Sequence, residues 1–227
     1  AEHGGRLNAY EKARQERSRL LFGELQGRRA DPNWLDALEA AMAEHGVAVA
    51  AARQEALRLL QQALAASQGP FPRAELALEG ELENGLGSSP AIDVEDSFRE
   101  ALRSGRRRDR EAGRALQGPH RSDLLVWHGE SMTPAAICST GQQKALLISI
   151  ILANARLMTA RATPPLLLLD EVAAHLDERR RAALFDAIGD LGVQAWMTGA
   201  DCGLFSALGG RAQYFTAARG SIREAAH

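Results

Sequence analysis

Residues 166–171 have the sequence Leu-Leu-Leu-Leu-Asp-Glu, an apolar run that ends in two carboxylates, Asp170 and Glu171. An apolar run of this length is typical of a short strand in a parallel sheet that is covered on both faces. Open α/β sheets bind ligands at the carboxyl ends of their strands, so the two acids are expected at a ligand-binding edge. One carboxylate there can hold Mg²⁺ and the next can orient an attacking water. A strand can also end in acids where it meets solvent, so the pattern needs a context.

A second pattern, Ser-Thr-Gly-Gln-Gln-Lys at residues 139–144, opens a helix predicted over 140–160. The first N–H groups of a helix have no partner within it and attract anions. Gly141 lets a phosphate approach the backbone, Ser139 adds a hydroxyl, and Lys144 adds a charge one turn later. The alternative is a helix cap with nothing bound, which is the commoner fate of such a sequence.

Strands and helices alternate in the second half of the chain. Strands are predicted over 124–127, 166–169 and 193–197, and a helix over 178–189 is capped by Asp177. A short helix near 203–208 and a hairpin around 218–220 follow. This alternation predicts an α/β domain of layered sheet and helices.

The first half is predicted to be mostly helical. A helix over 6–26 is followed by a break, and Asp31-Pro32 starts a second helix that continues to about residue 67. Apolar residues at alternating three- and four-residue spacing favour packing of the second helix against the first as an αα-hairpin. A strand over 73–83 and a helix over 91–111 complete this half.

The helix predicted over 91–111 ends in a cluster of arginines at positions 103, 106, 107, 108 and 110. Positive charge is favourable at a helix C-terminus, so a solvated capping cluster explains the run. Contacts from Arg106, Arg107 and Arg108 to DNA phosphates explain it equally well. The residues leave both interpretations open.

Composition excludes several classes of protein. The chain has 227 residues, a formal net charge of −2 and 45% hydrophobic residues, which excludes a polycation and a disordered tail. Two cysteines are too few for a disulfide framework and favour a reducing, cytoplasmic location. The longest apolar run is far too short to cross a membrane.

The order of these motifs resembles the C-terminal half of an ABC-type ATPase head. Residues 139–142 match the signature motif, 166–171 the Walker B strand and 175–177 the D-loop. Residues 142–144, residues 118–123 and the helical first half are similar in particular to the RecF family of bacterial recombination-repair ATPases. Specific motifs carry the likeness over 114–227, and topology alone carries it over 1–113. Thr140 departs from the transporter-type signature, which has glycine there.

The resemblance implies a helical arm over 1–113 and half of an ATPase head over 114–227. It implies that Asp170 helps to hold Mg²⁺ and that Glu171 activates the attacking water. Thr198 falls where ABC heads place a switch residue, often a histidine, although a threonine cannot replace an imidazole as a charged contact to the γ-phosphate. The residues that would bind ATP held by a second subunit, or lie at the dimer interface, are Ser139, Gly141, Gln142, Lys144 and Asp177.

A RecF-like function implies a cycle on DNA. ATP would join two heads into a homodimer at a single-strand/double-strand junction or gap, and hydrolysis would release them. The resemblance also implies transfer to RecR-type mediators and a part in DNA replication, recombination and the SOS response.

One essential motif is absent from the chain. A P-loop needs the pattern G-x-x-x-x-G-K-[ST], and neither Lys12 nor Lys144 lies in such a sequence. In the RecF family this element lies in an N-terminal lobe before the arm. The chain alone is therefore expected to bind ATP weakly and not to hydrolyse it.

Two further functions remain open on the sequence. The arm could belong to a protein-interaction module that carries a vestigial ATP half-site. The chain could also be the C-terminal half of another ABC ATPase, such as a transporter head, although the long arm argues against that.

Overall fold

The computed structural model describes residues 2–25, 27 and 30–225. Its contacts divide the chain into two compact units, Ala1–Leu59 with Leu76–Leu125, and Leu60–Glu75 with Val126–His227. The boundary expected between residues 113 and 114 differs from this division, because 60–75 group with the second unit and 114–125 with the first. The assignment of 1–113 and 114–227 to family lobes stays a prediction.

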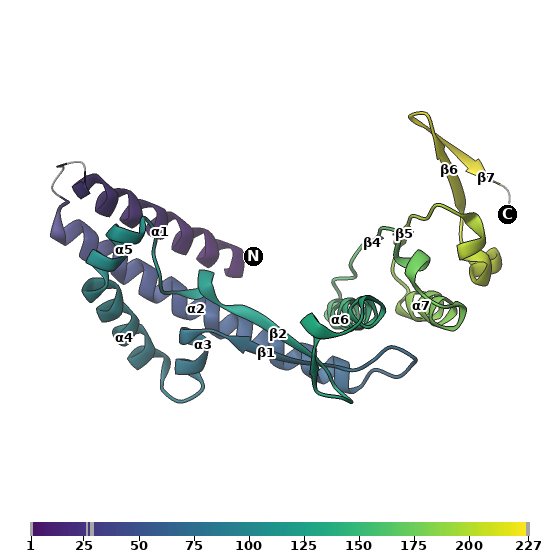
Figure 1. Cartoon of the computed structure of the whole chain (residues 1–227), viewed down its shortest axis with the longest axis horizontal. Coiled ribbons are helices and arrows are strands. Elements are labelled where there is room, and N and C mark those ends of the chain that lie inside the picture. The colour runs from purple at the N-terminus through teal and green to yellow at the C-terminus, as the bar shows by residue number, and fades with distance from the viewer. Residues whose placement is uncertain (1, 26, 28–29, 226–227) are drawn as a thin grey trace. The chain divides into compact units, whose positions relative to one another are not determined.

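Two long helices form the αα-hairpin of the first unit, α1 (Glu2–Leu25) and α2 (Pro32–Ala65) (Figure 1). The Asp31 carboxylate accepts the N–H of Asn33 at 2.9 Å, which confirms the expected helix start. Tyr10 of α1 belongs to the same buried cluster as Met42 of α2. The predicted apolar seam is buried only in its first part, because its later members Ala56, Leu59 and Ala63 are exposed or half-buried.

Three shorter helices of the first unit differ from the sequence prediction. The strand predicted over 73–83 ends earlier, as β1 (Ala74–Glu79), and α3 (Glu81–Leu86) follows it. The helix predicted over 91–111 is two helices, α4 (Ala91–Ser104) and α5 (Arg106–Ala112). They are separated at Gly105, where a Cβ would lie 2.8 Å from the carbonyl oxygen of Ala101. The arginine run therefore begins α5 instead of ending a single helix.

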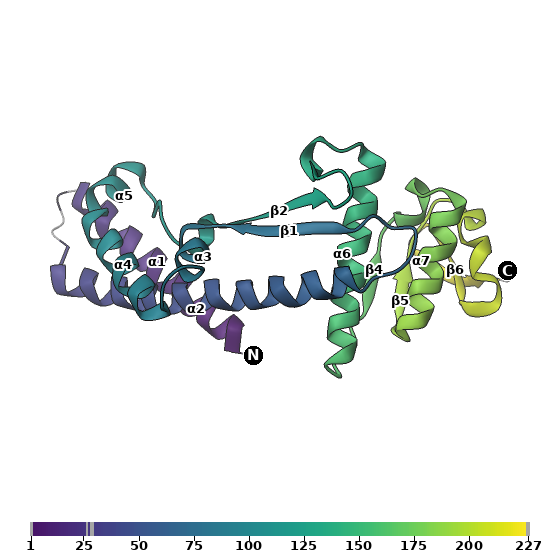
Figure 2. The same cartoon turned by 90° about the horizontal axis from the view of Figure 1, so that it is seen from below.

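A three-stranded sheet has the order β1-β2-β3, where β2 is Asp123–His128 and β3 is Thr133–Pro134. Figure 2 shows β1 and β2 side by side. Strand β3 pairs antiparallel with β2, with His128 opposite Thr133. Short 3-10 segments lie at Pro119–Arg121, before β2, and at Ala135–Ile137, after β3.

The second unit contains the predicted alternation of helices and strands. It consists of α6 (Thr140–Ala160), β4 (Leu167–Leu169), α7 (Glu178–Leu191) and β5 (Ala195–Met197), with 3-10 segments at Val172–His175 and Cys202–Arg211. Strands β4 and β5 are parallel, and β6 (Tyr214–Ala218) and β7 (Ser221–Ala225) form the expected terminal hairpin. Helix α6 has the predicted bounds. No helix in the described part of the chain is both long enough and apolar enough to cross a membrane.

One face of the β4–β5 pair is buried and the other is exposed. Leu167 and Leu169 belong to a core with side chains from α6 and α7. On the opposite face Leu168 is 72% exposed, and its cross-strand partner Trp196 is 52% exposed. Phe215 stacks on Trp196 with ring centroids 6.1 Å apart. The expectation of a strand covered on both faces is therefore wrong for the described residues.

Candidate functional site

The two carboxylates lie at the carboxyl end of β4, as predicted. The register that pairs Leu169 with Met197 brings Thr198, the residue after β5, beside them. The N–H of Thr198 donates to the carbonyl oxygen of Leu169 at 3.1 Å. The Thr198 hydroxyl donates to Oδ1 of Asp170 and accepts the N–H of Glu171, whose nitrogen lies 3.1 Å away.

A cavity of about 290 Å³ connects the strand end with α6. Its polar lining comes from Lys144, Asp170 and Glu171, and much of the remainder is the leucine and isoleucine surface of α6 and β4. Lys144 lies early in α6, so the start of this helix and the end of β4 are at the same end of the unit. The structure thus brings together three residues that the sequence assigned from two separate motifs.

The start of α6 is closed by a capping box. The Ser139 hydroxyl accepts the N–H of Gln142 at 3.3 Å, and Oε1 of Gln142 accepts the N–H of Ser139 at 3.1 Å. This is the helix cap that the sequence offered as the alternative to anion binding. A Cβ added at Gly141 would meet nothing within 4 Å, so this chain's own packing does not require glycine there.

Asp177 caps α7, which confirms the predicted helix start. Its Oδ1 accepts the N–H of Arg180 at 2.8 Å, and its Oδ2 lies 3.7 Å from Nε of the same arginine. The side chain is exposed. The predicted place of Asp177 at a dimer interface stays a prediction.

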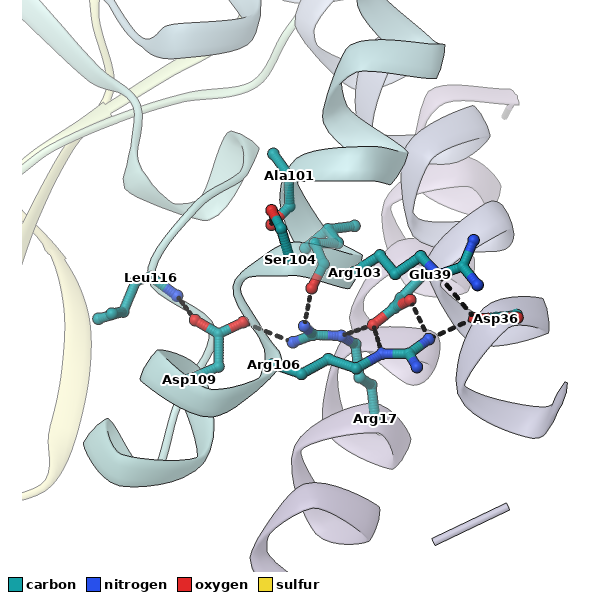
Figure 3. Close-up of polar contacts among 10 residues, drawn as sticks. Arg17, Asp36, Glu39, Ala101, Arg103, Ser104, Arg106, Asp109 and Leu116 are labelled. Atoms are coloured by element: carbon teal, nitrogen blue, oxygen red, sulfur yellow. Dashed lines mark hydrogen bonds and ion pairs between the residues drawn. The ribbon is translucent and has the colours of Figure 1, made fainter. Parts of the chain in front are cut away.

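The three arginines proposed for DNA contact have different surroundings in the first unit. Arg106 forms ion pairs with Asp36 and Glu39, and hydrogen bonding to Glu39 raises the pKa of its guanidinium further (Figure 3). Arg107 is mostly exposed and lies 3.6 Å from Glu111, and Arg108 is exposed. A phosphate contact by Arg106 would therefore have to compete with two carboxylates.

Sequence reasoning missed the fully buried arginine beside this cluster. Arg17 donates to Glu39 at 2.8 Å, to Asp109 at 2.6 Å and to the carbonyl oxygen of Leu102 at 2.6 Å (Figure 3). These partners lie on α2, α5 and α4. Arg17 occurs in a charged stretch of sequence, so only its burial distinguishes it from its neighbours.

The donor set at the end of β4 fits Mg²⁺ bound together with phosphate. Among the described residues no group of three or more histidine, cysteine or acidic side chains is placed to hold a metal ion. Mg²⁺ is commonly bound by one or two carboxylates, with water and substrate phosphates completing the octahedron. Asp170 meets that requirement, since the Thr198 hydroxyl contacts only one of its oxygens.

The known proteins that this chain resembles in sequence and in structure are RecF proteins. No protein-family model matches the chain. It is 53% identical to the DNA replication and repair protein RecF of Mesorhizobium japonicum over 223 residues, which cover 97% of this chain and 58% of that protein. It is 53% identical to RecF of Brucella abortus over 224 residues, which cover 97% of this chain and 57% of that protein.

Solved structures agree in fold. The chain is similar to a structure of the recombination mediator protein RecF-ATPrS in the RecFOR pathway, with a TM-score of 0.78 and 20% identity, over 99% of this chain and 59% of that one. A structure of RecF-ATP from the same pathway gives a TM-score of 0.75 at 18% identity. The chain spans less than two thirds of the relatives it matches. Identity of about one half along nearly the whole chain shows that it is related to the RecF proteins over the part of them that it spans.

Proposed function

We propose that this chain supplies the signature and Walker B half of a RecF-type ATPase that acts on DNA in recombinational repair. The observation that supports this most directly is the cavity that joins Lys144 to Asp170 and Glu171. Asp170 would hold Mg²⁺, which neutralises the charge of the phosphates when it is bound. Glu171 would orient the attacking water, as an acidic residue beside the metal can do.

The start of α6 would contact ATP that is held by a second copy of the complete protein. Thr140 and Gly141 carry N–H groups of the first helical turn, which attract anions. Gly141 leaves space for a phosphate from outside the chain. Ser139 and Gln142 would then exchange some of their mutual hydrogen bonds for bonds to the γ-phosphate. The predicted homodimer depends on this contact.

The exposed face of β4 and β5 supports the proposal that catalysis requires a further part of the protein that is not in this chain. Leu168 and Trp196 leave apolar surface in solvent at the sheet that carries the site. We propose that the phosphate-binding N-terminal part of the RecF proteins covers this face and supplies the P-loop. DNA and RecR-type mediators remain proposed partners, with Arg107 and Arg108 as the accessible candidates for phosphate contacts.

A chimera tests the catalytic assignment. The N-terminal part of the Mesorhizobium japonicum relative, up to the point where the likeness begins, is placed before this chain. The chimera is expected to hydrolyse ATP with Mg²⁺, and the chain alone is not. Glu171→Gln keeps the size of the side chain and removes the carboxylate, so turnover should fall by about 100-fold or more, as for a lost catalytic base.

The control for this experiment is Glu100→Gln, an exposed acid in α4 of the first unit. It should leave turnover unchanged. Equal turnover of wild type and Glu171→Gln would contradict the assignment. That result would favour the alternative function, a protein-interaction module that carries a vestigial ATP half-site.

A further inference from the structure

The hydroxyl of Thr198 makes two hydrogen bonds at the end of the β4–β5 pair. It donates to the carboxylate of Asp170 and accepts the N–H of Glu171 at 3.1 Å. A threonine hydroxyl carries one proton and can accept at its lone pairs, so both bonds form at once. One side chain on β5 thus connects both acids that follow β4.

The backbone of Glu171 explains why such a connection is needed. Glu171 has φ of 51° and ψ of 21°, in the left-handed region that side chains other than glycine rarely adopt. A residue held there costs free energy and keeps that conformation only when its surroundings fix it. The hydrogen bond from its N–H to Thr198 is such a constraint.

The sheet in turn fixes Thr198. Its N–H donates to the carbonyl oxygen of Leu169 at 3.1 Å, one residue beyond the ladder pair of Leu169 with Met197. The hydroxyl is therefore placed by paired backbone, and it occupies only one oxygen of Asp170. The second oxygen is left for a metal ion.

We infer that Thr198 is a positioning residue for the site at the end of β4, acting through Asp170 and Glu171. This inference rests on the proposed function. This role of Thr198 differs from that of a switch residue that touches the γ-phosphate, because the Thr198 hydroxyl is already hydrogen-bonded to Asp170 and Glu171. Partners that orient a metal ligand commonly change metal affinity or activity by about 10- to 100-fold when they are removed.

The first test needs neither ATP nor metal. Amide hydrogen exchange at Glu171 is measured by NMR in the 227-residue chain as wild type, Thr198→Val and Thr198→Ser. Valine keeps the shape and removes the acceptor, so exchange at Glu171 should become about two- to tenfold faster. Serine keeps the hydroxyl and should stay close to wild type. Thr216→Val, at an exposed strand threonine in β6, is the matched control.

The second test uses the chimera with the same variants. Thr198→Val should lower kcat by about 10- to 100-fold with little change in KM for ATP, and raise the Mg²⁺ concentration needed for half-maximal rate. Thr198→Ser should restore most of the rate. Thr198→Ala replaces the valine variant if that protein does not fold.

Three results would overturn the inference. Unchanged exchange at Glu171 in Thr198→Val means that the hydroxyl does not hold this residue. An unchanged kcat, or a rise in KM alone, means that it does not position the site, provided that Glu171→Gln abolishes turnover. If Glu171→Gln remains active, the proposed function fails first and the positioning role fails with it, so the two failures are distinguishable.

Discussion

Arg17 of α1 connects α2, α4 and α5 of the first unit through its side chain. Its guanidinium is fully buried and bonds to two carboxylates, Glu39 and Asp109, and to one carbonyl oxygen. Arg106 also pairs with Glu39 and Asp36, and Arg103 lies 3.9 Å from Asp36, so three arginines and three acids form a connected group (Figure 3). A buried charge is tolerated only when its partners satisfy it, and each member here depends on the others.

We expect Arg17→Ala to lower the free energy of unfolding by about 3–5 kcal/mol, because it leaves the buried carboxylate of Asp109 without a cation and that of Glu39 with Arg106 alone. Arg14→Ala, one turn earlier on α1, is the matched control. Arg14 pairs with Glu11 at a partly exposed position, and its loss should cost less than about 1 kcal/mol. Urea unfolding of both variants measures the difference. Equal losses in the free energy of unfolding for the two variants would show that the buried ion pairs of Arg17 add no more stability than the partly exposed pair of Arg14.

A hydrogen-bonded pair of buried Tyr10 and half-buried His120 is expected to make stability depend on pH. Tyr10 is buried, and its hydroxyl lies 2.7 Å from Nδ1 of His120, while Nε2 of His120 lies 3.0 Å from the carbonyl oxygen of Ala115. The carbonyl can only accept, so the proton is on Nε2 and Nδ1 accepts from Tyr10. Burial lowers the pKa of His120 and raises the pKa of Tyr10.

The sign of the pH effect follows from the lowered pKa of His120. Below about pH 6.5 the unfolded chain takes up a proton that the folded chain resists, so the free energy of unfolding falls as the pH falls. His120→Gln can still accept from Tyr10 and donate to Ala115 but does not titrate. Urea unfolding between pH 5 and 8, in steps of about one unit, should show a weaker pH dependence in this variant. Parallel curves for both proteins would contradict the prediction.

Among the elements, strand β4 has one face that packs in the core and one face that is exposed to solvent. Leu169 is 9% exposed and lies in the core, whereas its neighbour Leu168 is 72% exposed. The four leucines look alike in the sequence, and only the alternation of side chains along the strand distinguishes them.

We expect Leu169→Ala to cost the chain about 2–5 kcal/mol, the usual range for a buried leucine. Leu168→Ala should change its stability by less than about 0.5 kcal/mol. Thermal or urea unfolding measures both. In the chimera, Leu168→Glu should lower the rate of ATP hydrolysis. The N-terminal part is proposed to cover the exposed face of β4, so the substitution would place a charge in that interface. A chimera that tolerates Leu168→Glu fully would show that the N-terminal part does not use this face.

At the scale of the whole molecule, each unit has its own core, and the chain spans a little under three fifths of the RecF relatives it matches. The second unit has a complete hydrophobic layer between α6, α7 and one face of β4. The other face of β4 is apolar and exposed, and the charged lining of the cavity consists of Asp170, Glu171 and Lys144. The proposed completion of this site by the N-terminal part of a RecF-type protein rests on these two features.

Elements with local sequence patterns were predictable from the order of amino acids alone. Helix α6 and the caps of α2 and α7 were predictable because a capping side chain and the residues it caps are near neighbours in the chain. The order of the motifs at 139–144 and 166–171 was also enough to indicate the RecF likeness, since motif order is a property of the sequence alone. The break at Gly105 was missed, although glycine just after the last residue of a helix is a local signal for a helix end.

Which charged side chains are held inside the fold and which are accessible to a partner depends on how the chain packs. Arg106 and Arg107 are adjacent in the chain, but one is held by Asp36 and Glu39 and the other is mostly exposed. The structure also decided that Thr198 touches Asp170 and Glu171, through the pairing of β4 with β5. Both facts depend on contacts between residues far apart in the sequence, and burial and partner geometry exist only once those segments have packed.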